Sequence, residues 1–114
     1  MKRTKFVFSL LLVVLLVLVA FVPSKRVRAA APQAVDVTID NFSFTPPTIT
    51  VKVGTQITWT NRDDIPHTVV SDDLTFRSKT LDTDEKFTFT PTKPGTYPYY
   101  CSIHPKMTGK VVVE

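Results

Sequence analysis

The chain has 114 residues, enough for one domain, and carries 14 Lys and Arg against 10 Asp and Glu. Six of the basic residues precede Ala30, whereas all ten acidic residues follow it. The part after residue 29 therefore holds eight basic and ten acidic residues, a net charge of −2. This balance argues against a protein that binds nucleic acid through a basic surface.

Residues 1–29 have the organisation of a secretory signal peptide. A basic start precedes an apolar run over residues 6–22, and Val27 and Ala29 place small side chains at plausible signal-peptidase positions, so we expect cleavage after Ala29. Export would place the domain in the periplasm or on the extracellular face of the cytoplasmic membrane. The alternative is an uncleaved membrane anchor, because the 17-residue run is close to the short limit of a span of about 20 residues.

The rest of the chain predicts an all-β domain over residues 35–114, after a short linker at 30–34. Apolar and polar residues alternate in several short runs, which is typical of strands with one buried face. Phe42 and Phe44 are expected to continue the alternation of the first run, and Phe76 and Leu81 to cover the core from the least regular segment. The predicted strands are 35–40, 48–53, 56–60, 68–70, 86–90, 96–100 and 110–113. Short strands separated by turn residues indicate a β-sandwich or a barrel.

Proline conflicts with one of these strands. Pro98 lies within the run 96–100 and lacks the N–H that a central strand uses for pairing. The strand prediction therefore requires that the nitrogen of Pro98 points away from the neighbouring strand.

Four side chains with metal-binding atoms stand out in the second half of the chain. Cys101 is the single cysteine, His104 and Met107 follow it at intervals of three, and His67 lies upstream. A thiolate, two imidazoles and a thioether suit copper that cycles between Cu(I) and Cu(II). A free thiol in an oxidising compartment also needs protection, which a metal would provide.

Other metal sites fit these residues less well. A thioether is a poor ligand for zinc, and structural zinc sites usually take four Cys or His ligands. The dinuclear copper centre of oxidases needs two cysteines, and multicopper oxidases need additional histidines. The chain has one cysteine and two histidines.

The domain resembles the cupredoxins of the plastocyanin and amicyanin family. The resemblance is carried by Trp59-Thr60-Asn61, by Pro66-His67-Thr68-Val69, by Gly95-Thr96-Tyr97 and by the loop Cys101-x-x-His104-x-x-Met107. The short spacing of this loop is amicyanin-like, since plastocyanins carry a longer gap between the second histidine and the methionine.

This resemblance implies a Greek-key β-sandwich with one copper ion, Cu(I)/Cu(II), at one end. It implies His67, Cys101, His104 and Met107 as the ligands, and a hydrogen bond from the backbone N–H of Thr68 to the cysteine sulfur. Relatives often carry Asn at the position of Thr68, so the resemblance does not say which bond the side chain of Thr68 makes. Asn61 matches a family asparagine.

The resemblance further implies a protein that is not an enzyme but shuttles single electrons between extracytoplasmic redox partners. These partners would dock near His104, and we expect the protein to be a monomer with no nucleic-acid partner. The alternative function is a copper carrier or buffer without a role in electron transfer. The ligand set favours electron transfer, because carriers tend to use several Met or His in open sites.

Overall fold

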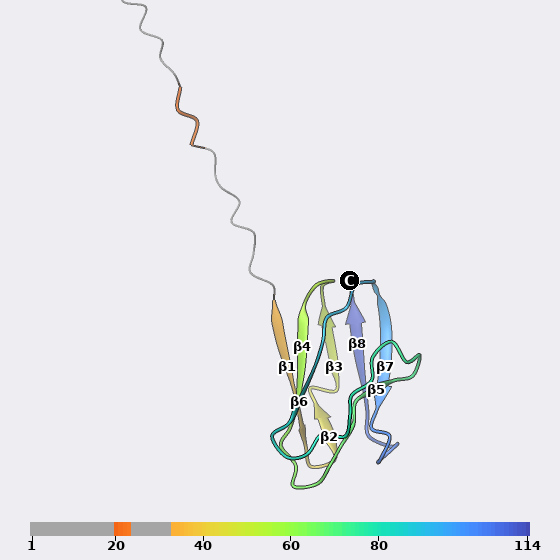
Figure 1. Ribbon diagram of the computed structural model, residues 1–114. Helices are drawn as coiled ribbons and strands as arrows, with labels where there is room; N and C mark the ends of the chain where they lie inside the picture. Colours follow the sequence, from red (N-terminus) through yellow and green to blue (C-terminus); the bar gives the residue numbers. More distant parts are fainter. Residues whose placement is uncertain (1–19, 24–32) are drawn as a thin grey trace, which may run out of the picture.

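The computed structural model describes residues 20–23 and 33–114, and its strands form two four-stranded sheets that make a sandwich (Figure 1). The strands are β1 Ala34–Asp40, β2 Ser43–Thr45, β3 Thr48–Val51, β4 Gln56–Asn61, β5 Val70–Ser71, β6 Lys86–Phe89, β7 Gly95–Tyr100 and β8 Thr108–Val113. The described residues contain no helix that is long and apolar enough to cross a membrane. The predicted all-β sandwich is confirmed.

The chain passes repeatedly between the two sheets. One sheet has the order β2-β1-β4-β6 and the other has the order β3-β8-β7-β5. Neighbouring strands are antiparallel except for β1 with β4 and β3 with β8, which are parallel. This connectivity brings the loops after β4 and β7 to the same end of the sandwich, opposite the C-terminus (Figure 1).

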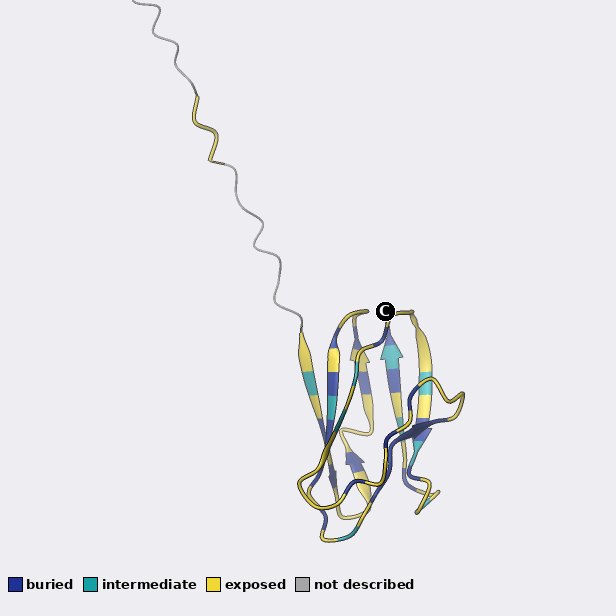
Figure 2. Ribbon diagram, in the orientation of Figure 1, coloured by how far each residue is buried: buried dark blue, intermediate teal, exposed yellow. Residues whose placement is uncertain are grey.

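The period-2 pattern of the strands produces the core. Buried and exposed residues alternate along β1, β3 and β4, so each strand turns one face inward (Figure 2). Trp59 is fully buried at the centre, with ring centroids 5.5 Å from Phe76, 5.6 Å from Phe87 and 5.5 Å from Tyr99. Phe76 and Leu81 are both buried in this core, as predicted. Aromatic pairs of this kind add to the stability gained from burial alone.

Two glycines occupy positions in or beside the strands that a larger residue would not fit. Gly54 has a φ of +87° in the turn between β3 and β4, a conformation that favours glycine. Gly109 lies opposite Tyr99 in the β7–β8 pair, and a Cβ atom there would collide with the phenol ring. The absence of a side chain at position 109 therefore makes room for Tyr99.

The structure explains how a strand accommodates Pro98. Its carbonyl accepts a hydrogen bond from the backbone N–H of Asp72, which follows the last residue of β5. The nitrogen and carbonyl of one strand residue face the same side, so the missing N–H falls beyond the end of β5 rather than against β8. The nitrogen of Pro98 thus points away from the neighbouring strand β8, as the strand prediction required.

Several sequence predictions are wrong in detail. Phe42 does not continue a strand: it lies in the turn between β1 and β2 with a φ of 56°, and only Phe44 is buried. The predicted strand 68–70 is replaced by the two-residue strand Val70–Ser71, because the N–H of Thr68 donates to the sulfur of Cys101 and the N–H of Val69 to the hydroxyl of Ser78 instead of to a neighbouring strand. The first strand begins at Ala34, one residue inside the predicted linker. The predicted segment 1–29 lies mostly outside the described residues.

Candidate metal centre

Two loops at one end of the sandwich carry the predicted ligands. The loop over residues 62–66 follows β4 and leads to His67, and the loop over residues 101–107 connects β7 to β8. We call them the first and the second ligand loop. The structure brings the ligand atoms of His67, Cys101 and His104 within 4.8 Å of one another.

Buried hydrogen bonds fix the first ligand loop. Asn61 is fully buried, and its side chain donates to the carbonyls of Ile65 and Leu81, each at 2.9 Å. The same side chain accepts from the backbone N–H of Asp63 at 3.0 Å. His67 then exchanges two backbone hydrogen bonds with Leu81. The asparagine singled out in the sequence thus holds the shape of the loop.

The second ligand loop is closed by its own backbone. The N–H of Cys101 donates to the carbonyl of Met107 at 3.1 Å, and the N–H of Met107 donates to the carbonyl of His104 at 2.9 Å. Cys101 is fully buried and Met107 is almost so, whereas His104 is partly exposed. The side chains of Met107 and His104 line the same apolar hollow at the surface.

The geometry of the three nearest donors fits a trigonal metal site. The sulfur of Cys101 lies 3.7 Å from Nδ1 of His67 and 3.8 Å from Nδ1 of His104. With sulfur about 2.3 Å and nitrogen about 2.0 Å from a metal, an angle of about 120° separates these atoms by about 3.7 Å. The two S···N distances are therefore those of a metal ion bound by Cys101 and both histidines.

Thr68 connects the two ligand loops at the sulfur. Its backbone N–H donates to the sulfur of Cys101 at 3.3 Å, the bond that the resemblance implies. Its hydroxyl accepts from the backbone N–H of Ser102 at 2.7 Å and lies 2.7 Å from the hydroxyl of Ser102. Threonine thus supplies a side-chain connection where relatives often carry asparagine. The sequence did not reveal Ser102 as its partner.

The surroundings of the sulfur favour the thiolate. Burial raises the pKa of the Cys101 thiol, but polar contacts with the N–H of Thr68, with His67 and with the backbone and side chain of His104 outweigh it and lower the pKa to about 6. A thiolate is the form of cysteine that binds metal. The site is therefore electrostatically prepared for a cation.

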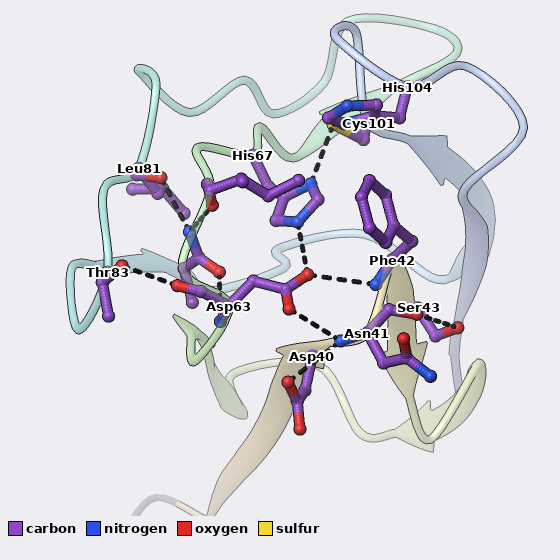
Figure 3. Close-up of polar contacts among 12 residues, drawn as sticks. Asp40, Asn41, Phe42, Ser43, Asp63, His67, Leu81, Thr83, Cys101 and His104 are labelled. Carbon is purple, nitrogen blue, oxygen red and sulfur yellow. Dashed lines mark hydrogen bonds and ion pairs between the residues drawn. The ribbon is translucent and has the colours of Figure 1, made fainter.

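Asp63 is a site residue that the sequence analysis missed. One of its carboxylate oxygens lies 2.7 Å from Nε2 of His67 and also accepts from the backbone N–H of Phe42 at 3.0 Å (Figure 3). The other oxygen accepts from the backbone N–H of Asn41 at 3.0 Å. The N–H of Phe42 lowers the pKa of Asp63 most strongly, against the effect of burial, and His67 and Asn41 lower it further.

The carboxylate has a clear effect on His67. Since Nε2 donates to Asp63, the opposite nitrogen, Nδ1, keeps its lone pair toward the sulfur of Cys101. Carboxylates commonly orient metal-binding histidines in this way.

Comparison with known proteins agrees with this geometry. The family model described as "Cupredoxin-like domain" matches residues 11–113. The chain belongs to the cupredoxin family. This cupredoxin is 37% identical to an amicyanin of Paracoccus denitrificans over 103 residues, which covers 83% of this chain and 79% of the relative.

Solved structures extend the comparison to the fold. A purple cupredoxin from Nitrosopumilus maritimus has a TM-score of 0.67 and 33% identity, covering 70% of this chain and 99% of its own. A Cu(I) form of an amicyanin variant has a TM-score of 0.67 and 38% identity, covering 74% and 85%. Copper is thus the ion found in a close structural relative, and His67, Cys101 and His104 form a group that can hold it.

Proposed function

We propose that this cupredoxin is a mononuclear type 1 (blue) copper protein that carries single electrons between extracytoplasmic redox partners. The observation that supports the proposal most directly is the position of the Cys101 sulfur, 3.7 and 3.8 Å from two imidazole nitrogens. A trigonal set of two His and one Cys with a weak axial Met is the arrangement of blue-copper electron-transfer sites. We assign the axial position to Met107.

Copper, when bound, supplies the one-electron couple between Cu(I) and Cu(II). The chain supplies ligands that keep their positions in both oxidation states. Asp63 orients His67, and Thr68 donates to the sulfur of Cys101 while its hydroxyl joins the two loops. Ligands fixed in this way need little rearrangement when an electron enters or leaves, so electron transfer is fast.

The exposed side of the site favours contact with other proteins. His104 is the partly exposed ligand, and it lines a hollow whose other residues are Phe42, Ile103, Pro105, Lys106 and Met107. Ile103 is 47% exposed and Phe42 is 51% exposed. We propose that donor and acceptor proteins dock on this apolar face, because it brings them closest to a ligand.

A carrier of copper is less well supported than a carrier of electrons. Handing over a metal requires a partner's ligands to replace those of the carrier one after another. Cys101 and His67 are fully buried, so a partner reaches the site only at His104. We propose no enzymatic activity for this domain. The N-terminal segment would direct export, as its sequence predicts.

The visible spectrum tests the proposed function. Loaded with Cu(II), the protein should show an intense blue band from sulfur-to-copper charge transfer, and ascorbate should bleach it. Cys101→Ser should abolish the band while the protein remains folded by circular dichroism. A Cys101→Ser variant that stays blue would refute the assignment.

The reduction potential tests Met107 separately. A thioether stabilises Cu(I) relative to Cu(II), and the axial ligand tunes the potential. Met107→Gln supplies a harder oxygen donor, so voltammetry should give a lower potential. An unchanged or higher potential would remove Met107 from the ligand set.

Electron self-exchange tests the docking face without a known partner. NMR line broadening in mixtures of the Cu(I) and Cu(II) forms reports how fast two copies exchange electrons. Ile103→Lys places a charge on the apolar face and should slow this exchange, whereas the exposed control Val53→Lys should not. Equal rates for both variants would contradict docking at His104.

A further inference from the structure

The turn between β1 and β2 contains a residue whose side chain is disfavoured in the backbone conformation that it adopts. Asn41 and Phe42 form a two-residue hairpin loop with φ values of 48° and 56°. Turns with two positive φ values favour Asn followed by Gly. Asn41 fits this preference, but Phe42 occupies the glycine position with a bulky side chain that is 51% exposed. Neither backbone preference nor burial in the core explains this phenylalanine.

The same turn is attached to the metal centre. The carboxylate of Asp63 accepts from the backbone N–H groups of both Asn41 and Phe42 and also binds Nε2 of His67 (Figure 3). The backbone of Phe42 is therefore fixed relative to a ligand by a nearly buried carboxylate. An unfavourable backbone conformation that neighbouring groups maintain is a signal of function.

The ring of Phe42 packs against both histidines. Its centroid lies 5.0 Å from that of His104 with an interplanar angle of 87°, and 5.6 Å from that of His67 with an angle of 85°. These are edge-to-face contacts, the favoured geometry for aromatic pairs. Figure 3 shows the phenyl ring beside the His67 imidazole and below His104.

The two histidines differ in what else orients them. His67 is fully buried and has Asp63 on its second nitrogen. Among the described residues, no side chain or backbone group hydrogen-bonds to the second nitrogen of His104. Rotation of the His104 ring is therefore constrained by packing, against Phe42 in a perpendicular contact and against His67, whose ring centroid lies 5.1 Å away.

We propose that Phe42 is a positioning residue that holds the His104 imidazole with Nδ1 toward the Cys101 sulfur. The inference rests on the proposed copper site and adds a residue that the ligand motif does not contain. Perpendicular packing disfavours rotation of the His104 ring away from the metal. Loss of the phenyl ring should make the loss of copper roughly 2- to 12-fold faster, the factor expected for one edge-to-face contact.

The experiment compares Phe42→Gly with Leu74→Gly as a matched control. Leu74 is also an exposed apolar residue at a positive φ, 60°, but it lies in the turn after β5, and in the described part of the chain it makes no hydrogen bond to the three ligands. Both changes relieve an unfavourable backbone conformation. Phe42→Tyr keeps the ring, and Phe42→Leu keeps an apolar side chain without it.

Three measurements separate positioning from a structural role. Urea unfolding of the metal-free proteins shows how each change affects the fold, so that copper loss can be compared among variants apart from their stability. Bleaching of the blue band by excess EDTA reports copper loss, and NMR of the Cu(I) form reports motion of the His104 ring. We expect faster bleaching and broadened His104 ring signals for Phe42→Gly and Phe42→Leu, and parent behaviour for Phe42→Tyr and Leu74→Gly.

Two results would overturn the proposal. Parent rates of copper loss with unchanged His104 signals in Phe42→Gly would show that the ring does not position the histidine. Full recovery by Phe42→Leu would show that the side chain acts only as an apolar cover. The spectrum of the parent protein tests the proposed copper site by itself, so a missing blue band there is distinguishable from a failure of the Phe42 variants.

Discussion

Replacement of Asp63 by alanine should destabilise the metal-free protein and weaken copper binding together. Asp63 is 8% exposed, and its carboxylate accepts hydrogen bonds from the backbone of Asn41 and Phe42 and from Nε2 of His67. Alanine leaves these three donors without their partner. The change therefore acts on the fold and on a ligand at the same time.

The size of the effect follows from where the three donors lie. A buried donor that loses its partner costs about 1–3 kcal/mol, and more beside a charged group. His67 is fully buried and should show the upper part of this range, whereas water can reach the two backbone donors of the turn. We expect a loss of about 3–5 kcal/mol in the free energy of unfolding. A domain of this size has about 4–12 kcal/mol in total, so the loss is a large fraction of it.

Two assays measure the two consequences. Urea unfolding of the metal-free protein gives the free energy of unfolding, and competition with a chelator gives the copper affinity. Removal of a carboxylate that orients a metal-binding histidine typically weakens metal binding about 10- to 100-fold. Asp63→Asn should show an intermediate loss of stability. The amide oxygen of Asn can still accept a hydrogen bond, but its NH2 group would face one of the three N–H donors instead of accepting from it.

Asp64→Ala is the matched control for Asp63→Ala. Asp64 is the exposed neighbour, and within the described ranges its carboxylate has no hydrogen-bond partner. It should leave both measurements unchanged. A loss of less than about 1 kcal/mol in Asp63→Ala, with parent copper affinity, would refute the role assigned to the carboxylate.

The remaining predictions concern Gly109, Thr68 and Asp73. Gly109→Ala should lower the free energy of unfolding by about 1–3 kcal/mol, because the new Cβ collides with the Tyr99 ring; an unchanged melting temperature would contradict this packing. Thr68→Val removes the hydroxyl that joins the two ligand loops but keeps the backbone N–H on the sulfur, so urea unfolding should show a loss of about 1 kcal/mol while the blue band persists. Loss of the band would assign the hydroxyl a direct role at the metal. Hydrogen bonds from Thr75 lower the pKa of Asp73 in the folded protein. The charge of Asp73 therefore stabilises the fold at pH values above its unfolded pKa of about 3.8. This stabilisation is lost as the pH falls through the lower pKa of the folded state. Asp73→Asn should therefore be less stable than the parent at neutral pH, with a difference that shrinks in acid; a difference that is constant with pH would contradict the charge effect.

The sequence predicted the sandwich and the ligand group because both leave local patterns. Alternation of apolar and polar residues marks β1 and β4 directly, since a strand places neighbours on opposite faces. The spacing of Cys101, His104 and Met107 lies within one short loop, so it is visible without knowledge of the fold. The position of His67 after a strand-like run completed the set.

The turn at Phe42 was missed although the sequence contained a sign of it. The buried residues of β1 fall on odd positions, at Val37 and Ile39, whereas Phe44 falls on an even one. A strand cannot change phase without a turn or a bulge, since its side chains alternate with a period of two. The shift between Ile39 and Phe44 therefore locates the turn, even though Asn-Phe is not a favoured turn sequence.

The support around the ligands was missed for a different reason. Asp63 binds the backbone of Asn41 and Phe42 across more than 20 residues of sequence, and Thr68 binds Ser102 across 34. Such contacts depend on which loops meet at one end of the sandwich. Period and spacing describe neighbours in sequence, so they do not carry this information.

The different environments of the two histidines follow from their positions in the sandwich. The second nitrogen of His67 is enclosed, and a buried N–H without an acceptor would cost about 1–3 kcal/mol, so a carboxylate is needed there. The ring of His104 is partly exposed, so water can serve its second nitrogen. A carboxylate at that position would also place a charge on the face where we propose that partners dock. An aromatic ring can orient His104 without adding charge, which makes Phe42 compatible with both a fixed ligand and an apolar docking face.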